Sequence, residues 1–193
     1  MAGRSTGLFG ISDLPFRLVF LMWLTFTVQF YTQWNLFFLG VKPHNFFGLI
    51  GILTGPLIHS GFYHIVSNSV PLLFLGTVLF FFYQEIGKAV FFSSYFIPNI
   101  LVWLFSPRAT FHIGASGMIY SLAAFLILFG ILRRDFLSLL VSAAILAIYG
   151  SIFLYGLLPQ DVSVSWEAHL GGAITGVGVA VYFYQREDVG VRH

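Results

Sequence analysis

Residues 109–132 read ATFHIGASGMIYSLAAFLILFGIL and lie between Arg108 and Arg133 without one charged side chain. Five more uncharged stretches follow one another along the chain, at 18–41, 43–84, 89–107, 136–160 and 168–185. Each is about as long as the ~20 residues that a helix needs to cross a bilayer, or longer. A lone strand would leave its backbone groups unpaired in lipid, so the spans are expected to be helical. The sequence therefore predicts an all-α membrane protein.

Composition leads to the same class of protein. Only 8% of the 193 residues are charged and 58% are hydrophobic, whereas a soluble domain carries roughly a quarter charged residues. The nine basic residues are scattered along the chain, so we interpret them as topology signals and expect no nucleic-acid partner. Cysteine is absent, which excludes disulfides and thiolate metal sites. We expect a single domain, 1–193, surrounded by membrane lipid.

Six spans are predicted, at about 16–36, 63–83, 89–107, 115–132, 136–158 and 168–185. A membrane-dipping loop is expected after the first, because residues 43–61 are rich in the helix breakers glycine and proline. With a cytoplasmic N-terminus, seven basic residues lie inside and two, Lys42 and Arg108, lie outside, in agreement with the positive-inside rule. A model with seven spans would place at best six basic residues inside and three outside. We expect a multi-pass protein of a prokaryotic cell (inner) membrane with both termini cytoplasmic.

Three polar clusters open the second, fourth and sixth predicted helices. They contain His59, His64 and Asn68; then Gly114, Ser116 and Gly117; then His169 and Gly172. Polar residues are costly inside lipid and indicate a function there. Alternate helices of a bundle begin at the same membrane face, in a seven-span arrangement as well. The three clusters are therefore expected to lie at similar depth on one face.

The fourth and sixth of these helices carry the residues for acyl transfer. A serine hydroxyl is a weak nucleophile until a neighbouring histidine takes its proton, and Ser116 with His169 can supply that pair. The two helices must then approach closely, which small residues allow in lipid. Gly172 and Gly176 are small residues in a GxxxG spacing, one and two turns after His169.

Acyl transfer also needs hydrogen-bond donors for the developing oxyanion. His64 and Asn68 are four residues apart and share one face of the second helix. The backbone N–H of Ser116 lies at a helix start, where such groups have no partner within the helix. We predict these three as the donors.

The ordered set of motifs resembles the rhomboid intramembrane serine proteases. His64-Ile-Val-Ser-Asn68, Gly114-Ala-Ser116-Gly117 and Ala168-His169-Leu-Gly-Gly172 match the family's HxxxN, GxSG and AHxxG patterns. The resemblance implies a six-helix bundle with a dyad of Ser116 and His169, an oxyanion site of Ser116, His64 and Asn68, and no cofactor or metal. It implies cleavage of peptide bonds in or near the spans of single-span membrane proteins. Tyr120 matches a family tyrosine that stacks near the histidine, and His59 matches a frequent family histidine.

The resemblance also assigns a substrate gate to residues 136–158 and the loop 159–167. Two features depart from the family. A Trp-Arg pair frequent in the first loop is absent between Trp34 and Gly61. Glu167 lies two residues before His169 and, as a hypothesis, favours the protonated imidazole and moves the activity profile to higher pH.

Three other functions compete with this interpretation. A rhomboid-like pseudoprotease would bind transmembrane helices without cutting them, but such relatives usually lack the serine or the histidine. A transporter or channel tends to hold ionisable groups at mid-membrane. A zinc site would need His59, His64, His169 and His112, of which we interpret His112 as a loop residue, and HExxH is absent. The sequence predicts no oligomeric state.

Overall fold

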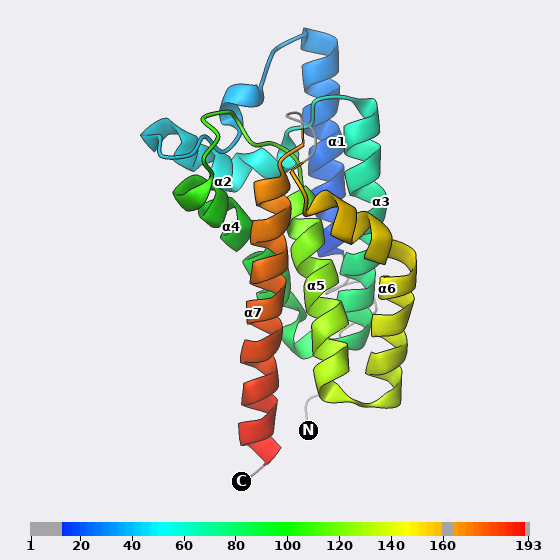
Figure 1. The fold of residues 1–193 in the computed structure, drawn as a ribbon. Coiled ribbons are helices and arrows are strands. Elements are labelled where there is room, and N and C mark those ends of the chain that lie inside the picture. The colour runs from blue at the N-terminus through cyan, green and yellow to red at the C-terminus, as the bar shows by residue number, and fades with distance from the viewer. Residues whose placement is uncertain (1–12, 160–163, 192–193) are drawn as a thin grey trace, which may run out of the picture.

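The described part of the chain folds into a bundle of six long helices. The computed structural model describes residues 13–159 and 164–191, where regular structure is helical. The long helices are α1 (Leu14–Thr32), α3 (Phe62–Phe82), α4 (Gln84–Phe105), α5 (Ser116–Arg133), α6 (Phe136–Gly156) and α7 (Trp166–Val191). Successive long helices alternate in direction, so that α3, α5 and α7 all begin at the same end of the bundle (Figure 1). The polar clusters predicted for these three helices consequently lie at one end.

Five of the long helices, α1 and α3–α6, are apolar and long enough to cross a membrane. α7 contains the sixth predicted span but is not among the five, because His169 and several glycines interrupt its apolar residues. Three boundaries lie four or more residues from the expected ones, and one of them is the end of α7, at Val191 rather than at residue 185. α1 ends at Thr32 rather than at residue 36, since Gln33 adopts a left-handed φ of 56°. α4 begins at Gln84 and takes the charged Glu85 and Lys88 into its first turns.

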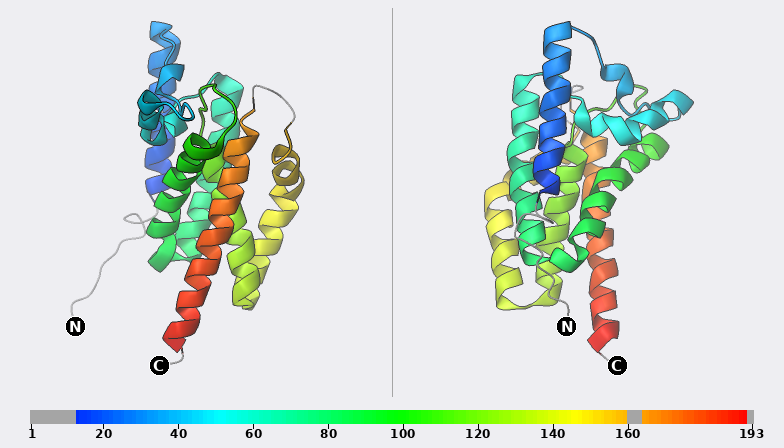
Figure 2. Two further views of the ribbon diagram at one scale, coloured as in Figure 1. Left: turned by 60° about the vertical axis from the view of Figure 1, so that its left-hand side comes forward. Right: turned by 180° about the vertical axis from the view of Figure 1, so that it is seen from behind.

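The segment between α1 and α3 consists of short helical pieces. They are η1 (Phe37–Leu39), η2 (Phe46–Leu49), α2 (Ile50–Thr54) and η3 (Gly55–Leu57). The last three follow one another without a break, from Phe46 to Leu57. No long helix forms in this segment, which the structure describes throughout and which is rich in glycine and proline. The right-hand view of Figure 2 shows these pieces projecting sideways from the long helices. Of the gate loop 159–167, residues 160–163 lie outside the described part of the chain.

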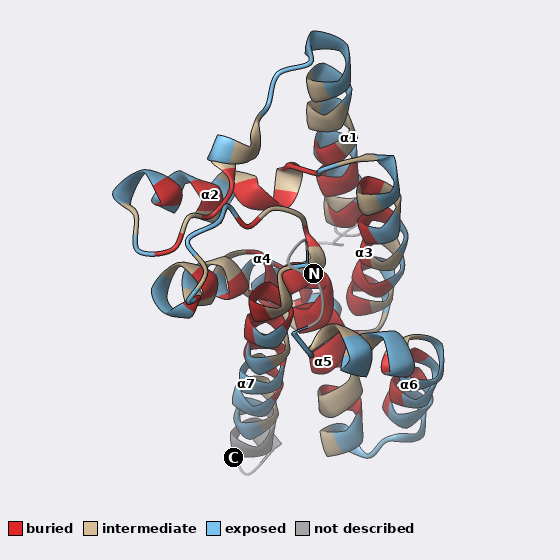
Figure 3. Cartoon of the chain, turned by 45° about the horizontal axis from the view of Figure 1, so that its top comes forward, coloured by how far each residue is buried: buried red, intermediate tan, exposed pale blue. Residues whose placement is uncertain are grey.

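α5 lies at the centre of the bundle. In its most apolar stretch 67% of the residues are buried, against 17% in α1. It packs most extensively against α7, then against α6, α4 and α3. The buried surfaces in Figure 3 accordingly gather on α5 and on the helix faces turned toward it. A residue at the start of α5 is therefore surrounded by protein rather than by lipid.

Glycines bring α5 and α7 into backbone contact. A Cβ added at Gly172 would lie 2.9 Å from the Tyr120 Cβ and would collide with the Gly117 carbonyl oxygen. One added at Gly176 would lie 2.8 Å from the Ala124 Cβ and would collide with the carbonyl of Ser121. This is the close approach that the GxxxG spacing predicts.

We expect Gly176→Ala to lower stability by about 1–3 kcal/mol, because the extra methyl separates α5 from α7. The measurement is the unfolding midpoint of the purified protein in detergent. Gly178→Ala, on the same helix, is the matched control, since an added Cβ there meets nothing within 4 Å. A midpoint for Gly176→Ala equal to that of the control would contradict the close contact.

Candidate active site

The three polar clusters line one cavity of about 730 Å³ among α3, α5, α6, α7 and the loop before α5. His64 and Asn68 of α3, Ser116 and Tyr120 of α5, and His169 of α7 all contribute to its wall. His59 is fully buried outside this lining, and its ring packs edge-on to that of His64 with centroids 4.9 Å apart. The structure thus brings together residues that are more than one hundred positions apart in the chain.

Ser116 is the first residue of α5, directly after the cap residue Ala115. Its backbone N–H therefore points out of the helix start, at the positive end of the helix dipole. Gly114 makes this turn with a φ of +100°, a conformation that favours glycine. A Cβ at Gly114 would lie only 2.6 Å from the His64 Nε2. The local backbone and the neighbouring imidazole therefore both require glycine here.

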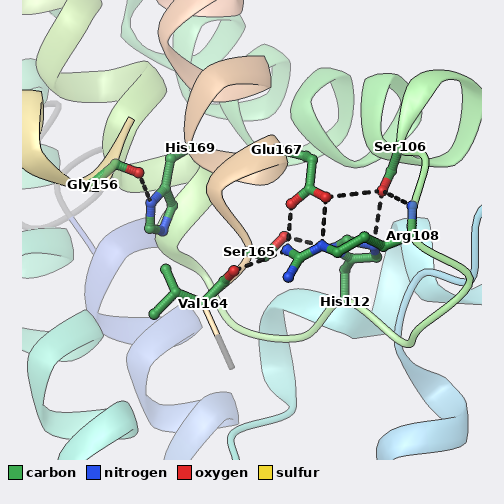
Figure 4. A network of polar contacts seen from close by, with 8 residues as sticks. All are labelled: Ser106, Arg108, His112, Gly156, Val164, Ser165, Glu167 and His169. Atoms are coloured by element: carbon green, nitrogen blue, oxygen red, sulfur yellow. Dashed lines mark hydrogen bonds and ion pairs between the residues drawn. The ribbon is translucent and has the colours of Figure 1, made fainter. Parts of the chain in front are cut away.

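The ring of His169 is held by two contacts. Its Nδ1 lies 2.8 Å from the carbonyl oxygen of Gly156, the last residue of α6 (Figure 4). A carbonyl only accepts, so Nδ1 carries the hydrogen and Nε2 of the neutral ring is the acceptor. The ring also stacks on Tyr120, with centroids 4.2 Å apart and planes at 1°. Tyr120 in turn donates to the carbonyl of Ile152 on α6 at 3.1 Å.

Tyr120, on which His169 stacks, lies on the same helix as Ser116. Ser116 lies four residues before Tyr120, one turn away on the same face of α5. Next to it, a Cβ at Gly117 would lie 3.0 Å from the carbonyl oxygen of Ala168. The start of α5 and the start of α7 are therefore in contact where the two side chains face the cavity.

His64 is held in the opposite tautomer to His169. The Ser60 backbone N–H lies 3.4 Å from its Nδ1, and the Ser60 hydroxyl lies 3.1 Å from the same atom. Because a backbone N–H only donates, Nδ1 accepts and the neutral ring carries its hydrogen on Nε2, beside Gly114. Asn68 donates from Nδ2 to the His64 carbonyl at 2.7 Å, which leaves one amide hydrogen for another acceptor.

Glu167 is engaged by Arg108 rather than by His169. The carboxylate accepts from Arg108 Nε at 2.5 Å and from a terminal guanidinium nitrogen (Figure 4). Burial raises the pKa of Glu167, but the hydrogen bonds from Arg108 and from its own backbone, together with the charges of Arg108 and His112, outweigh burial and leave the pKa below its ordinary value. The carboxylate thus binds Arg108 and not the His169 ring, so its charge acts on His169 only at a distance, and the hypothesis that it favours a protonated His169 stays a prediction.

Three supporting contacts were not predicted from sequence: those of Gly156, Ser60 and Arg108. Gly156 acts through its backbone carbonyl, which carries no sequence signal, whereas Ser60 acts through both its backbone N–H and its hydroxyl. Arg108 did carry one, since it is the only charged residue between Lys88 and Arg133. His112, interpreted as a loop residue, is buried between Ser106 and Ser165. In the described part of the chain, no three metal-ligating side chains gather in one group.

The family model of the Rhomboid domain matches residues 46–186. Among similar proteins, "Uncharacterized protein Rv1337" of Mycobacterium tuberculosis (strain ATCC 25618 / H37Rv) is 35% identical over 153 residues, which cover 74% of this chain and 62% of that protein. "Uncharacterized protein ML1171" of Mycobacterium leprae (strain TN) is 35% identical over 150 residues, 69% of this chain and 55% of the relative. "Putative rhomboid protease YdcA" of Bacillus subtilis (strain 168) is 25% identical over 141 residues, which cover 71% of this chain and 68% of that protein.

The chain thus spans less than two thirds of the length of these mycobacterial relatives. Together with the five apolar helices, the family match identifies an integral membrane protein in a lipid environment. The bacterial origin of the relatives fits a prokaryotic membrane.

We expect Gly114→Ala to lower stability by about 1–3 kcal/mol, because it adds both backbone strain and a collision with the His64 ring. Thermal unfolding in detergent measures this. Gly61→Ser is the control at the same end of the bundle. An added Cβ there meets nothing within 4 Å, and serine suits a helix start. Equal midpoints for the two variants would show that the His64 ring does not occupy the space beside Gly114.

Proposed function

The chain belongs to the rhomboid family, and from this premise we propose that it is an intramembrane serine endopeptidase with Ser116 as nucleophile and His169 as general base. One observation carries the proposal. In the cavity that Ser116 lines, His169 donates from Nδ1 to the Gly156 carbonyl, so its Nε2 is the nitrogen left to accept a proton. A general base needs this tautomer in order to activate a serine hydroxyl.

The reaction proceeds by acyl transfer. Ser116 Oγ bonds to the carbonyl carbon of the scissile peptide while its proton passes to His169 Nε2, and the carbonyl electron pair moves to the oxygen. Collapse of this adduct expels the amine, which takes the proton from His169 and leaves an acyl-serine. A water molecule then gives a proton to His169 and attacks the acyl carbon. Expulsion of the Ser116 oxygen, which regains the proton, releases the carboxylic acid.

The oxyanion is stabilised by donors on two helices. The Ser116 backbone N–H points from the start of α5. The Nε2 hydrogen of His64 and the second amide hydrogen of Asn68 come from α3. Donors fixed in advance stabilise charge more strongly in a site that excludes bulk water than in solution.

Substrates are single-span membrane proteins. The deeper wall of the cavity is apolar and comes from three helices: Leu75 of α3, Ile119 and Ala123 of α5, and Tyr149 and Phe153 of α6. Such a wall favours an apolar polypeptide segment over a charged one. With both termini in the cytoplasm, the end of the bundle that holds the site faces outward, as the positive-inside rule requires.

We expect a fluorophosphonate probe to label the detergent-purified protein, and expect the labelling to disappear in Ser116→Ala and in His169→Ala. The probe reports an activated serine without any need to know the substrate. Ser165→Ala is the control, because Ser165 also lines the cavity and its hydroxyl lies 2.5 Å from His112 Nδ1. Labelling that survives in Ser116→Ala and is lost in Ser165→Ala would overturn the assignment. No labelling of the folded wild type would favour a pseudoprotease.

We expect His64→Ala and Asn68→Ala each to slow this labelling by about 10²–10³-fold, the usual effect of removing one oxyanion donor. Ser67→Ala is the control. Ser67 lines the same cavity, but its hydroxyl donates to the His64 backbone carbonyl at 2.9 Å. Rates of both variants within a few-fold of the control would mean that His64 and Asn68 only join helices.

A further inference from the structure

A buried polar network joins the segment that leads into Ser116 with the segment that leads into His169 (Figure 4). The first segment, residues 106–115, contributes Ser106, Arg108 and His112. The second, residues 164–169, contributes the Val164 carbonyl, Ser165 and Glu167. Ser106, His112 and Glu167 are each less than a tenth exposed. The network thus connects two parts of the chain that are about sixty residues apart in sequence.

The strongest link is the ion pair of Arg108 with Glu167. The guanidinium holds both carboxylate oxygens, one through Nε and one through a terminal nitrogen. That terminal nitrogen also donates to the Val164 carbonyl at 2.9 Å. The Glu167 side chain is 7% exposed and that of Arg108 is 24% exposed. A two-pronged pair of this kind fixes orientation as well as distance, which a single ammonium contact does not.

His112 extends the network to a third segment. Its ring lies between two hydroxyls, with Nδ1 2.5 Å from Ser165 Oγ and Nε2 3.2 Å from Ser106 Oγ. Its backbone pairs in both directions with Val41, in the loop after α1, at 2.8 and 2.9 Å. Burial lowers the pKa of His112, although Glu167 opposes this effect.

The network reaches the first turn of α7 through Ser165. The Ser165 carbonyl accepts from the backbone N–H groups of Ala168 and His169, at 3.0 and 3.2 Å. Glu167 lies between Ser165 and Ala168, in the same turn. A displacement of Glu167 or Ser165 therefore moves the backbone that carries His169.

We propose that the Arg108–Glu167 ion pair is a positioning device that sets His169 at its working distance from Ser116. The inference rests on the proposed function and adds two positioning residues to it. Glu167 is not a third catalytic residue, because its carboxylate binds Arg108 and Ser106 while the His169 Nδ1 binds the Gly156 carbonyl. The pair acts on geometry, through the backbone of α7.

The test measures the rate of fluorophosphonate labelling on the alkaline plateau, where the base is neutral in every variant. Arg108→Lys and Glu167→Asp keep both charges but lose the two-pronged geometry. We expect each to label about tenfold more slowly than wild type, since small misplacements of reacting groups slow reactions strongly. We expect the double variant to be no slower than the slower single, because both changes remove one link.

The pH dependence of the labelling rate distinguishes an effect on the position of His169 from an effect on its charge, because the rate falls at acid pH, on the acid limb of the profile, where His169 is protonated. The groups that face His169 are His64 on α3, Tyr120 on α5 and the Gly156 carbonyl on α6, with Arg108 and Glu167 beyond them. Glu167→Gln leaves the Arg108 cation uncompensated, which disfavours the imidazolium, so the limb should move to lower pH. Arg108→Lys and Glu167→Asp should leave the limb in place.

Arg133→Lys is the matched control. Arg133 pairs with Asp135 at the other end of α5, with Nε and Oδ2 3.2 Å apart, and its plateau rate should equal that of wild type. Wild-type plateau rates in both Arg108→Lys and Glu167→Asp, or strictly multiplicative losses in the double variant, would overturn the positioning role. Each of these outcomes leaves the wild type labelled and therefore contradicts only the positioning role. A wild type that is folded but not labelled would contradict the proposed function itself.

Discussion

The backbone contact between α5 and α7 is the constraint on which the rest of the site depends. At Gly117, Gly172 and Gly176, any side chain would meet the backbone or a Cβ of the opposite helix. Lipid offers no hydrophobic driving force between helices, so close packing of this kind has to hold them together. The proposed nucleophile and base lie in the first turns of these two helices. The packing that stabilises the bundle therefore also determines how Ser116 and His169 are placed in the wall of the same cavity.

α6 provides the second support, and it does so without a charge. The Gly156 carbonyl orients His169, and the Ile152 carbonyl accepts from Tyr120, whose ring stacks on the histidine. A carboxylate in that place would have to be desolvated inside a membrane protein, at a cost of several kcal/mol without a partner. A backbone carbonyl at a helix end already lacks a partner within the helix and serves as acceptor. This explains physically how a histidine can be oriented here without an acid.

The sequence predicted the long helices and the polar clusters because these depend on local patterns. Uncharged stretches indicated the helices, and the HxxxN, GxSG and AHxxG motifs indicated which helix starts would face one cavity. The contact of Gly156 could not be predicted, because any residue type supplies the same backbone carbonyl. The Arg108–Glu167 pair had a signal in two isolated charges beside the motifs. Pairing them required the fold, since the linking residues belong to segments that only tertiary packing brings together.

Charge is distributed unevenly around the cavity, and this distribution suits the proposed chemistry. Arg108 is the only Lys, Arg, Asp or Glu among the described residues that line it, and its charge is met by Glu167. The deeper wall is apolar, and the three histidines that line the cavity, His64, His112 and His169, are held through hydrogen bonds to uncharged groups. The oxyanion of the transition state would therefore be a new charge in surroundings of low polarity. Donors aimed at it stabilise it more there than in water, so that the apolar wall proposed to receive a membrane segment would also strengthen the donors that act on the oxyanion.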